Sequence, residues 1–294
     1  MSEGLGLATI LGCLDAGEKL MGLRPEDWKA ANNANFGQHM FVDFQRLFRP
    51  GLKYFDAETL RSFATNVHPD LLKKMAEWKM RLDSPPDDGP DAIYMISQLR
   101  EQMNWLFTGK RADRDWPEFV LTKGIHFYNV GYTDNFVVRI DVAGGDKVFV
   151  VRLGKPGDKP LAGLDIYQVI TLFETTLEPA LKCKYEAVQI PCIYAEMEPS
   201  LNWILGMHNR GKEIAYAQQK LVYAMNEVGF VALEETAMTA LEVYHPEPVP
   251  FILSPNGENF LLWRRRKGVE FPISMFHFTP DNFKDPGDLS KIVE

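Results

Sequence analysis

Apolar residues recur with helical spacing in four segments of the chain. Residues 5–21 are the clearest case, and a second amphipathic stretch covers 68–82. The same spacing predicts helices near 163–177 and over 212–225. In the first segment, the positions that share one helix face are Leu7, Ile10, Leu11, Leu14 and Leu20. The chain is therefore expected to begin with a buried helix.

A period of two, with many β-branched and aromatic side chains, predicts the strands. Such stretches cover 124–132, 135–154, 185–197 and 258–279. Within 135–154, the step Gly144-Gly145-Asp146 predicts a hairpin turn. The last stretch reads as two strands joined at Arg266-Lys267-Gly268. Helices and strands without any repeat predict a mixed α+β protein in a single domain, 1–294.

The segment 224–241, AMNEVGFVALEETAMTAL, fits two structures. As a strand, it would place every second residue after Gly229 on one face. As a helix, it would align Phe230, Leu233, Ala237 and Leu241 in one apolar stripe. Because Ala, Leu, Glu and Met are strong helix formers, we expect a helical or irregular exposed loop, with the strand as the alternative.

The charge of the chain is moderately acidic. Its 294 residues include 40 acidic and 32 basic ones, which gives a formal net charge of −8 and argues against a general nucleic-acid surface. The local exception is the cluster Arg264, Arg265, Arg266 and Lys267, which is either a contact for an anionic partner or a solvated hairpin tip. No apolar run approaches the length of a membrane span, so the expected partners include neither nucleic acid nor a membrane.

Residue patterns typical of catalytic, metal or cofactor sites do not occur in the sequence. The cysteines Cys13, Cys183 and Cys192 form no CxxC pair, and the six histidines lack metal-ligand spacing. No phosphate-binding loop or nucleophile motif is found. We therefore expect no enzyme activity, no metal and no cofactor.

The N-terminal apolar stretch, 5–14, follows Glu3 and has no basic residue before it. A signal peptide would begin with a positively charged region, so none is expected here. An intracellular location is favoured on this ground, with export by another route left open.

Several segments follow one another in an order that resembles the serpin family. In the C-terminal half these are YEAVQIPCIYAEM, LNWILGM, KLVYAMNEVG and NFLLWRRRKGVEFPISMFHFTP, which ends at Pro280. Upstream, Trp105 resembles the tryptophan beneath the top of the family's sheet A, and LATILGCLDAGEK resembles its buried helix B. The first helix of the family is missing, and Gly6 and Ala8 replace the helix B serines. The chain thus looks like a shortened serpin, of the kind encoded by large DNA viruses.

The resemblance implies an α+β serpin-like fold with a large central mixed sheet, smaller antiparallel sheets and packed helices. It also implies that Glu227-Val228-Gly229 opens a reactive loop, exposed over 230–250. In the family's inhibitors this loop is cleaved and then inserts as a strand of sheet A, which traps the protease. The resemblance assigns the hinge of this loop to Glu227, Gly229, Phe230, Ala232, Glu234 and Thr236. Met238 and Ala240 would follow on the inward face of the inserted strand.

Two of the hinge side chains oppose insertion. Phe230 stands where the inhibitors favour threonine or serine, so it would require volume that a closing sheet lacks. Glu234 would bury an unpaired carboxylate. The leading hypothesis is therefore a non-inhibitory protein that binds a protein partner, such as a protease or a host protein.

The alternative hypothesis is an inhibitor of serine or cysteine proteases. Counting forward from Gly229 places the scissile bond near Val243-Tyr244, whereas counting back from Phe260 places it near Pro248, with His245 between them. Transport of a small apolar ligand has precedent in the family, but no residue of this sequence argues for it. Strand edges left open by missing elements would suit a homo-oligomer.

Overall fold

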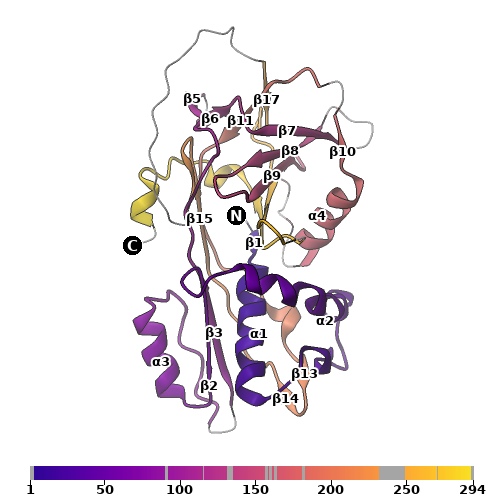
Figure 1. Ribbon diagram of the computed structural model, residues 1–294, viewed down its shortest axis with the longest axis vertical. Coiled ribbons are helices and arrows are strands. Elements are labelled where there is room, and N and C mark those ends of the chain that lie inside the picture. The colour runs from indigo at the N-terminus through magenta and orange to yellow at the C-terminus, as the bar shows by residue number, and fades with distance from the viewer. Residues whose placement is uncertain are drawn as a thin grey trace.

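The computed structural model describes residues 3–89, 92–114, 116–130, 135–155, 158, 161, 164–180, 183–231, 249–269 and 271–292, apart from the side chains at 44 and 113. Figure 1 shows two regions along the long axis. The upper one contains most of the strands and helix α4 (Leu164–Thr176). The lower one contains helices α1 (Leu7–Met21), α2 (Phe36–Phe48) and α3 (His68–Glu77) with strands β2 (Leu60–Thr65) and β3 (Tyr94–Leu99).

The largest sheet has seven strands, and all its described pairings are antiparallel. In order across the sheet these are β1 (Glu3–Leu5), β19 (Ser274–Phe278), β18 (Phe260–Arg265), β9 (Lys147–Arg152), β8 (Phe136–Asp141), β7 (Ile125–Asn129) and β10 (Glu178–Pro179). The turn between β8 and β9 contains Gly144 and Gly145 with φ of +88° and +94°, as the hairpin prediction required. The strands expected in 124–132, 135–154 and 258–279 are confirmed.

Four smaller sheets are formed by other described residues. Two of them have four strands: β17 (Pro250–Ile252), β11 (Ala187–Pro191), β6 (Pro117–Leu121) and β5 (Lys110–Asp113) in one, and β12 (Ile193–Met197), β15 (Leu221–Met225), β16 (Gly229–Phe230) and β4 (Met103–Asn104) in the other. The two-stranded sheets pair β2 (Leu60–Thr65) with β3 (Tyr94–Leu99) and β13 (His208–Asn209) with β14 (Lys212–Glu213). The α+β class with one large sheet is confirmed. A mixed sheet was expected to be the large one. The parallel pairing found among the described strands lies instead in a small sheet, between β11 and β17.

The described residues include four α-helices that pack on these sheets: α1 (Leu7–Met21), α2 (Phe36–Phe48), α3 (His68–Glu77) and α4 (Leu164–Thr176). Short 3-10 turns cover Pro25–Asp27, Arg49–Tyr54, Asn202–Ile204, Pro280–Asn282 and Leu289–Ile292. Helix α1 ends at Gly22 in the left-handed conformation, and Asn35 caps α2 by accepting a hydrogen bond from Gln38 N at 2.9 Å. The helices expected over 5–21 and 163–177 are confirmed, and the one expected over 68–82 is confirmed as far as Glu77. Residues 78–82 lie beyond its end and are not helical.

The helix expected over 212–225 is wrong. Leu221–Met225 form β15, which pairs with β12 along its whole length. The apolar residues of this segment also satisfy a period of two, because Leu221 and Tyr223 both pack into the core. The partner strand lies more than twenty positions away in the sequence, so local spacing could not reveal it.

Two large apolar cores lie on opposite faces of the seven-stranded sheet. Helices α1, α2 and α4 cover one face, where Trp263 stacks on Phe149 with ring centroids 5.2 Å apart. The smaller sheets cover the other face, where Phe260 and Phe278 are fully buried. A third, small core joins α3 to β2 and β3. In consequence β2 and β3 are held between α1 and α3, apart from the main sheet (Figure 1).

Candidate functional site

The site centres on the hinge segment, residues 226–231, which turns back from β15 at the upper end of its sheet. Strand β16 pairs on one side with β15, Met225 opposite Phe230, and on the other side with β4. The ladder continues one residue further, because Val231 N donates to Ala224 O at 3.0 Å. At its start, therefore, the ambiguous segment 224–241 is a strand, as in the alternative prediction.

Gly229 is required by the close approach of two strands. A Cβ atom at this position would lie 2.1 Å from the carbonyl oxygen of Met103 and 2.7 Å from Cα of Asn104. Both atoms belong to the backbone of β4 and cannot rotate away. Any side chain at position 229 would consequently push β16 out of the sheet.

Phe230 is buried, with 1% of its surface exposed. Its ring centroid lies 5.2 Å from that of Trp105 and 5.9 Å from that of Tyr223. Trp105 is itself 3% exposed, and its indole Nε1 donates to Asn226 O at 2.9 Å. The expectation that the exposed loop begins at residue 230 is therefore wrong for Phe230. The volume expected to be lacking for this side chain is present, because Trp105 and Tyr223 form an aromatic pocket around it.

Arg264 lies over the Phe230 ring, with Cζ 5.6 Å from the centroid. The guanidinium is 3% exposed; its Nη2 lies 3.0 Å from Oδ2 of Asp146 and also contacts Glu101. Glu101 lies between β3 and β4, whereas Arg264 belongs to β18 of the large sheet. This buried ion pair therefore connects the two regions of the fold.

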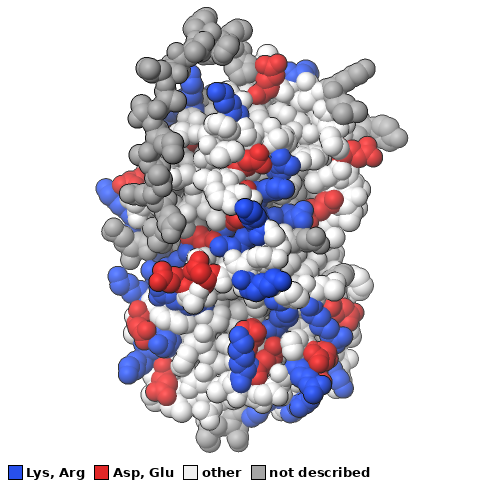
Figure 2. Space-filling view, viewed as in Figure 1, with Lys and Arg blue, Asp and Glu red and all other residues white. Residues whose placement is uncertain are grey.

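Three of the four residues of the expected anionic contact, 264–267, form internal ion pairs. Arg266 also contacts Glu101, and Arg265 Nη1 lies 3.6 Å from Oε1 of Glu174. Lys267 is the exposed member of the cluster. Figure 2 shows basic and acidic side chains intermixed over the face it presents. The arginines thus hold the fold together and do not form an open cationic surface.

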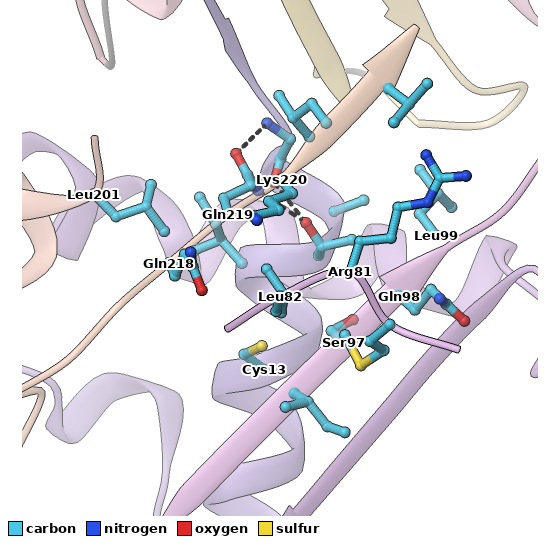
Figure 3. A pocket seen from close by; sticks show the side chains of 18 of the residues that line it. Cys13, Arg81, Leu82, Ser97, Gln98, Leu99, Leu201, Gln218, Gln219 and Lys220 are labelled. Carbon is cyan, nitrogen blue, oxygen red and sulfur yellow. Dashed lines mark hydrogen bonds between the residues drawn. The ribbon is translucent and has the colours of Figure 1, made fainter. Parts of the chain in front are cut away.

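Below Phe230 the sheet of β2 and β3 separates from the sheet that contains β12 and β15. Among the described residues, β3 pairs with β2, β15 pairs with β12 and β16, and no pairing joins β3 to β15. A cavity of about 450 Å³ occupies this gap. Figure 3 shows Arg81 and Leu82 between the segment that carries Gln218 and Lys220 and the strand that carries Ser97 and Leu99. The gap is aligned with β16, where the next residues of an added strand would continue.

A strap, residues 79–85, follows α3 and crosses the gap. Asp83 N donates to Oε1 of Gln218 at 3.1 Å, and Gln218 Nε2 donates back to Asp83 Oδ2 at 2.9 Å. Lys220 Nζ lies 3.9 Å from the same carboxylate. Together these contacts tie the strap to the segment that leads into β15.

Helix α1 closes the opposite side of the gap. Gln219, 6% exposed, accepts from Gly6 N at 3.0 Å and donates to Gly6 O at 2.9 Å. It also donates to Thr9 Oγ1 at 3.0 Å. Cys13 lines the cavity, and burial raises the pKa of its thiol to about 12. Gly6 and Ala8, which replace the serines of the family's helix, line the same cavity. A Cβ atom at position 6 would lie 3.0 Å from Nε2 of Gln219, so this glycine makes room for the Gln219 side chain.

Exposed apolar residues lie beside the hinge segment. Trp105 N donates to Val228 O at 3.1 Å and Gly109 N to Glu227 O at 2.7 Å, so the two backbones run together. Leu106, Phe107 and Val228 are exposed there by 50%, 45% and 40%. Glu227 is held at the surface by Arg111, whose Nη1 lies 3.2 Å from its Oε2. This surface, which we call the hinge patch, comprises Leu106, Phe107 and Val228.

The remaining candidate residues lie outside the described part of the chain. These are the hinge positions Ala232, Glu234 and Thr236 and the scissile positions Val243, Tyr244, His245 and Pro248. The chain is described again from Val249, which is 63% exposed and leads into β17.

Sequence reasoning missed Glu101, Asp146 and Gln219. Glu101 follows an apolar stretch and Asp146 closes a hairpin turn, so neither stands in a motif. Their roles depend on Arg264 and Gly6, which are more than a hundred positions away. Only the alternation in Leu221–Met225, taken as a strand, could have predicted that Gln219 faces inward.

The chain matches solved structures over nearly its whole length. Against mouse protein-Z dependent protease inhibitor the TM-score is 0.53 at 9% identity, with 94% of this chain and 90% of that chain covered. Against a serpin of the trematode Schistosoma haematobium it is 0.52 at 12% identity, with 94% and 93% covered. The chain has a serpin-like fold. No protein-family model and no curated protein matches the sequence, so at these identities the comparison establishes the fold alone.

The serpin-like fold does not by itself define a chemistry. Human thyroxine-binding globulin in complex with its ligand has the same fold, with a TM-score of 0.51 at 10% identity and 97% and 93% covered. Among the described residues no group of three or more His, Cys, Asp or Glu side chains is arranged to hold a metal ion. None of the described helices is both long and apolar enough to span a membrane.

Proposed function

We propose that this serpin-like protein does not trap proteases by loop insertion and acts by binding a protein partner. The observation that carries the proposal is the register of β16. Met225 lies opposite Phe230, so continuation of the same antiparallel ladder places residue 232 opposite Tyr223 and residue 234 opposite Leu221.

This register puts Glu234 on the inward face of an inserted strand. Leu221 and Tyr223 pack into the core, and directly opposed residues point to the same side of a sheet. Arg264, a cation on this side, already contacts Glu101 and Asp146. A carboxylate inserted at position 234 would be buried on the side of Arg264, which is already paired, whereas Lys79 of the strap is exposed to solvent. Burying the carboxylate there costs several kcal/mol or requires its protonation.

The partner surface that we propose is the hinge patch together with the loop that begins beyond it. Leu106, Phe107 and Val228 form adjacent exposed apolar positions where the loop begins, and Val249 is exposed where it ends. Clustered apolar side chains of this kind, rimmed by charges such as Glu227 and Arg111, are typical of protein contacts. The partner is expected to be a protease or another protein that recognises the loop.

The proposal is tested by cutting the loop. The protein is nicked within 232–248 by a series of proteases, and Tm is measured before and after, with denaturing gels to detect a covalent complex. We expect no rise in Tm and no complex. A marked rise in Tm after nicking would overturn the proposal, because it would mean that the cut loop enters the gap with Glu234 in place.

A pair of variants isolates the carboxylate. Glu234→Ala removes the inward charge, whereas Glu235→Ala removes the neighbouring charge, which a strand would direct outward. We expect nicked Glu234→Ala to melt higher than nicked wild type, and nicked Glu235→Ala to behave like wild type. Equal behaviour of the two variants would remove Glu234 as the cause.

The second candidate function is inhibition of a serine or cysteine protease. It is favoured by β16 itself, which already forms the first two positions of an added strand, and by the gap that continues from it. The scissile bond would then lie between Val243 and Pro248. A covalent complex on the gel, with cleavage mapped to this region by mass spectrometry, would decide for this function.

A further inference from the structure

We propose that the gap between β3 and β15 binds an elongated apolar molecule with one negatively charged end, such as a long-chain carboxylate. The inference goes beyond the proposed function and does not depend on it, since the cavity is present before any insertion of the loop. Its volume, about 450 Å³, lies in the range of small-molecule sites.

The wall of the cavity is largely apolar on three sides. Helix α1 contributes Ile10 and Leu14, β3 contributes Met95 and Ile96, and the segment around the third 3-10 turn contributes Leu201 and Ile204. Cys13 adds a thiol that burial keeps neutral. An alkyl chain placed here would replace water along these side chains, which is the favourable term in such binding.

The charges along the cavity favour an anion. Its lining includes the cations Lys79, Arg81, Arg100, Lys220 and Arg264 and the carboxylates Asp83 and Glu101. Two of these cations already have close partners, since Lys220 Nζ lies 3.0 Å from Oε1 of Glu198 and Arg264 contacts Asp146 and Glu101. The charge available to a negative headgroup therefore lies at the outer end of the cavity, on the strap that carries Lys79 and Arg81.

The strap is the expected place for the headgroup. Lys79 is exposed and has no ion-pair partner among the described residues. Arg81, on the same segment, has a side chain that is 57% exposed, and its Nη1 lies 4.0 Å from Oε1 of Glu196, which is a weak contact. A carboxylate near these two side chains would keep contact with water while its tail enters the gap beside Leu82. A headgroup at the strap does not have to be buried. At the inner end of the cavity it would be buried beside Arg264, which is already paired with Glu101.

The test uses 11-(dansylamino)undecanoic acid as a fluorescent probe with the full chain. We expect saturable binding of one probe per chain, and displacement by dodecanoate at concentrations at least tenfold lower than by dodecanol or dodecylamine. Absence of saturable binding would overturn the proposal. Equal displacement by the three competitors would overturn the assignment of an anionic ligand.

Paired variants locate the site. Cys13→Phe fills the cavity, whereas Cys183→Phe adds the same ring at a cysteine outside it. We expect at least a tenfold loss of affinity for the probe in the first and none in the second, with Tm showing that both are folded. Leu82→Trp, on the half-exposed strap, is the second blocking variant. Unchanged affinity in a folded blocking variant would place the probe elsewhere and overturn the proposal.

A second pair tests the headgroup contact. Lys79→Gln removes a cation of the strap, and Lys73→Gln removes an exposed cation of α3 that does not line the cavity. The preference for dodecanoate over dodecanol should fall about threefold or more in the first and stay constant in the second.

A peptide of residues 229–240 serves as a further competitor for the probe. If the peptide displaces the probe and dodecanoate does not, the gap is assigned to the chain's own loop and the proposal is overturned.

Discussion

The seven-stranded sheet and the divided sheet below it are built on opposite plans. In the first, each internal strand pairs on both sides, and both faces are covered by apolar cores. In the second, β3 and β15 face each other across a cavity, and the two-residue strand β16 joins the halves only at the top. The first plan supplies stability, and the second leaves room for one more strand or a ligand. The variants below test this difference.

The largest effect is expected where the two regions meet. Arg264→Ala leaves Asp146 without its buried cation and Glu101 with Arg266 alone, so the free energy of unfolding should fall by about 3–5 kcal/mol. Urea denaturation measures it. Lys267→Ala is the control, because this member of the cluster is exposed and its loss should cost no more than about 0.5 kcal/mol. Equal losses would show that the buried pair does not connect the regions.

A pair of leucines compares the closed and the open sheet directly. Leu262 in β18 is fully buried, so Leu262→Ala should lower the free energy of unfolding by about 3 kcal/mol. Leu82 lies half-buried beside an existing cavity, so Leu82→Ala should cost about 1 kcal/mol or less. If the strap variant were as unstable as the core variant, the lower region would be as tightly packed as the upper one.

The strand pairing that joins the halves at the top is tested at Gly229. Gly229→Ala should expel β16 and lose the burial of Phe230, which lowers the free energy of unfolding by about 2–3 kcal/mol. Fluorescence of Trp105 should change as its ring loses Phe230. Phe230→Leu keeps the backbone of β16 and is expected to cost only about 1 kcal/mol. A folded Gly229→Ala protein with unchanged fluorescence would contradict the tight contact with β4.

The smallest effect depends on pH and concerns the large sheet. His277 is 2% exposed, and burial lowers its pKa from 6.5 to about 4. Below pH 6.5 the unfolded chain binds a proton that the folded chain does not, so stability is complete at pH 7 and falls toward pH 4. Between pH 7 and 5 the loss should be about 2 kcal/mol.

Asparagine is the informative replacement at position 277. Nδ1 of His277 accepts a hydrogen bond from Leu161 N at 2.6 Å, and the amide oxygen of Asn can take over this role without titrating. Urea denaturation of His277→Asn at pH 7 and 5 should therefore show a smaller loss than in wild type. An unchanged pH dependence would assign the proton uptake to other groups.

Local pattern predicted those elements whose partners are neighbours in sequence. Strands β8 and β9 could be read from alternation and a Gly-Gly turn, because the hairpin closes on itself. β15 could not, since its partner β12 lies beyond an intervening turn and a small hairpin. Phe230 was taken as too large for the same reason, because Trp105 and Tyr223 come together only in the folded chain. The resemblance to serpins supplied the fold that periodicity alone could not.

The position of the buried ion pair also determines how the lower sheet can open. Glu101–Arg264 and β16 both lie at the upper end of the gap, and the two hydrogen bonds between Asp83 and Gln218 cross it further along. Widening therefore takes the form of a wedge with its apex at Phe230, and displacement grows with distance from that point. Amide hydrogen exchange should be fastest at the far end of β3, near Tyr94, and slowest beside Met103.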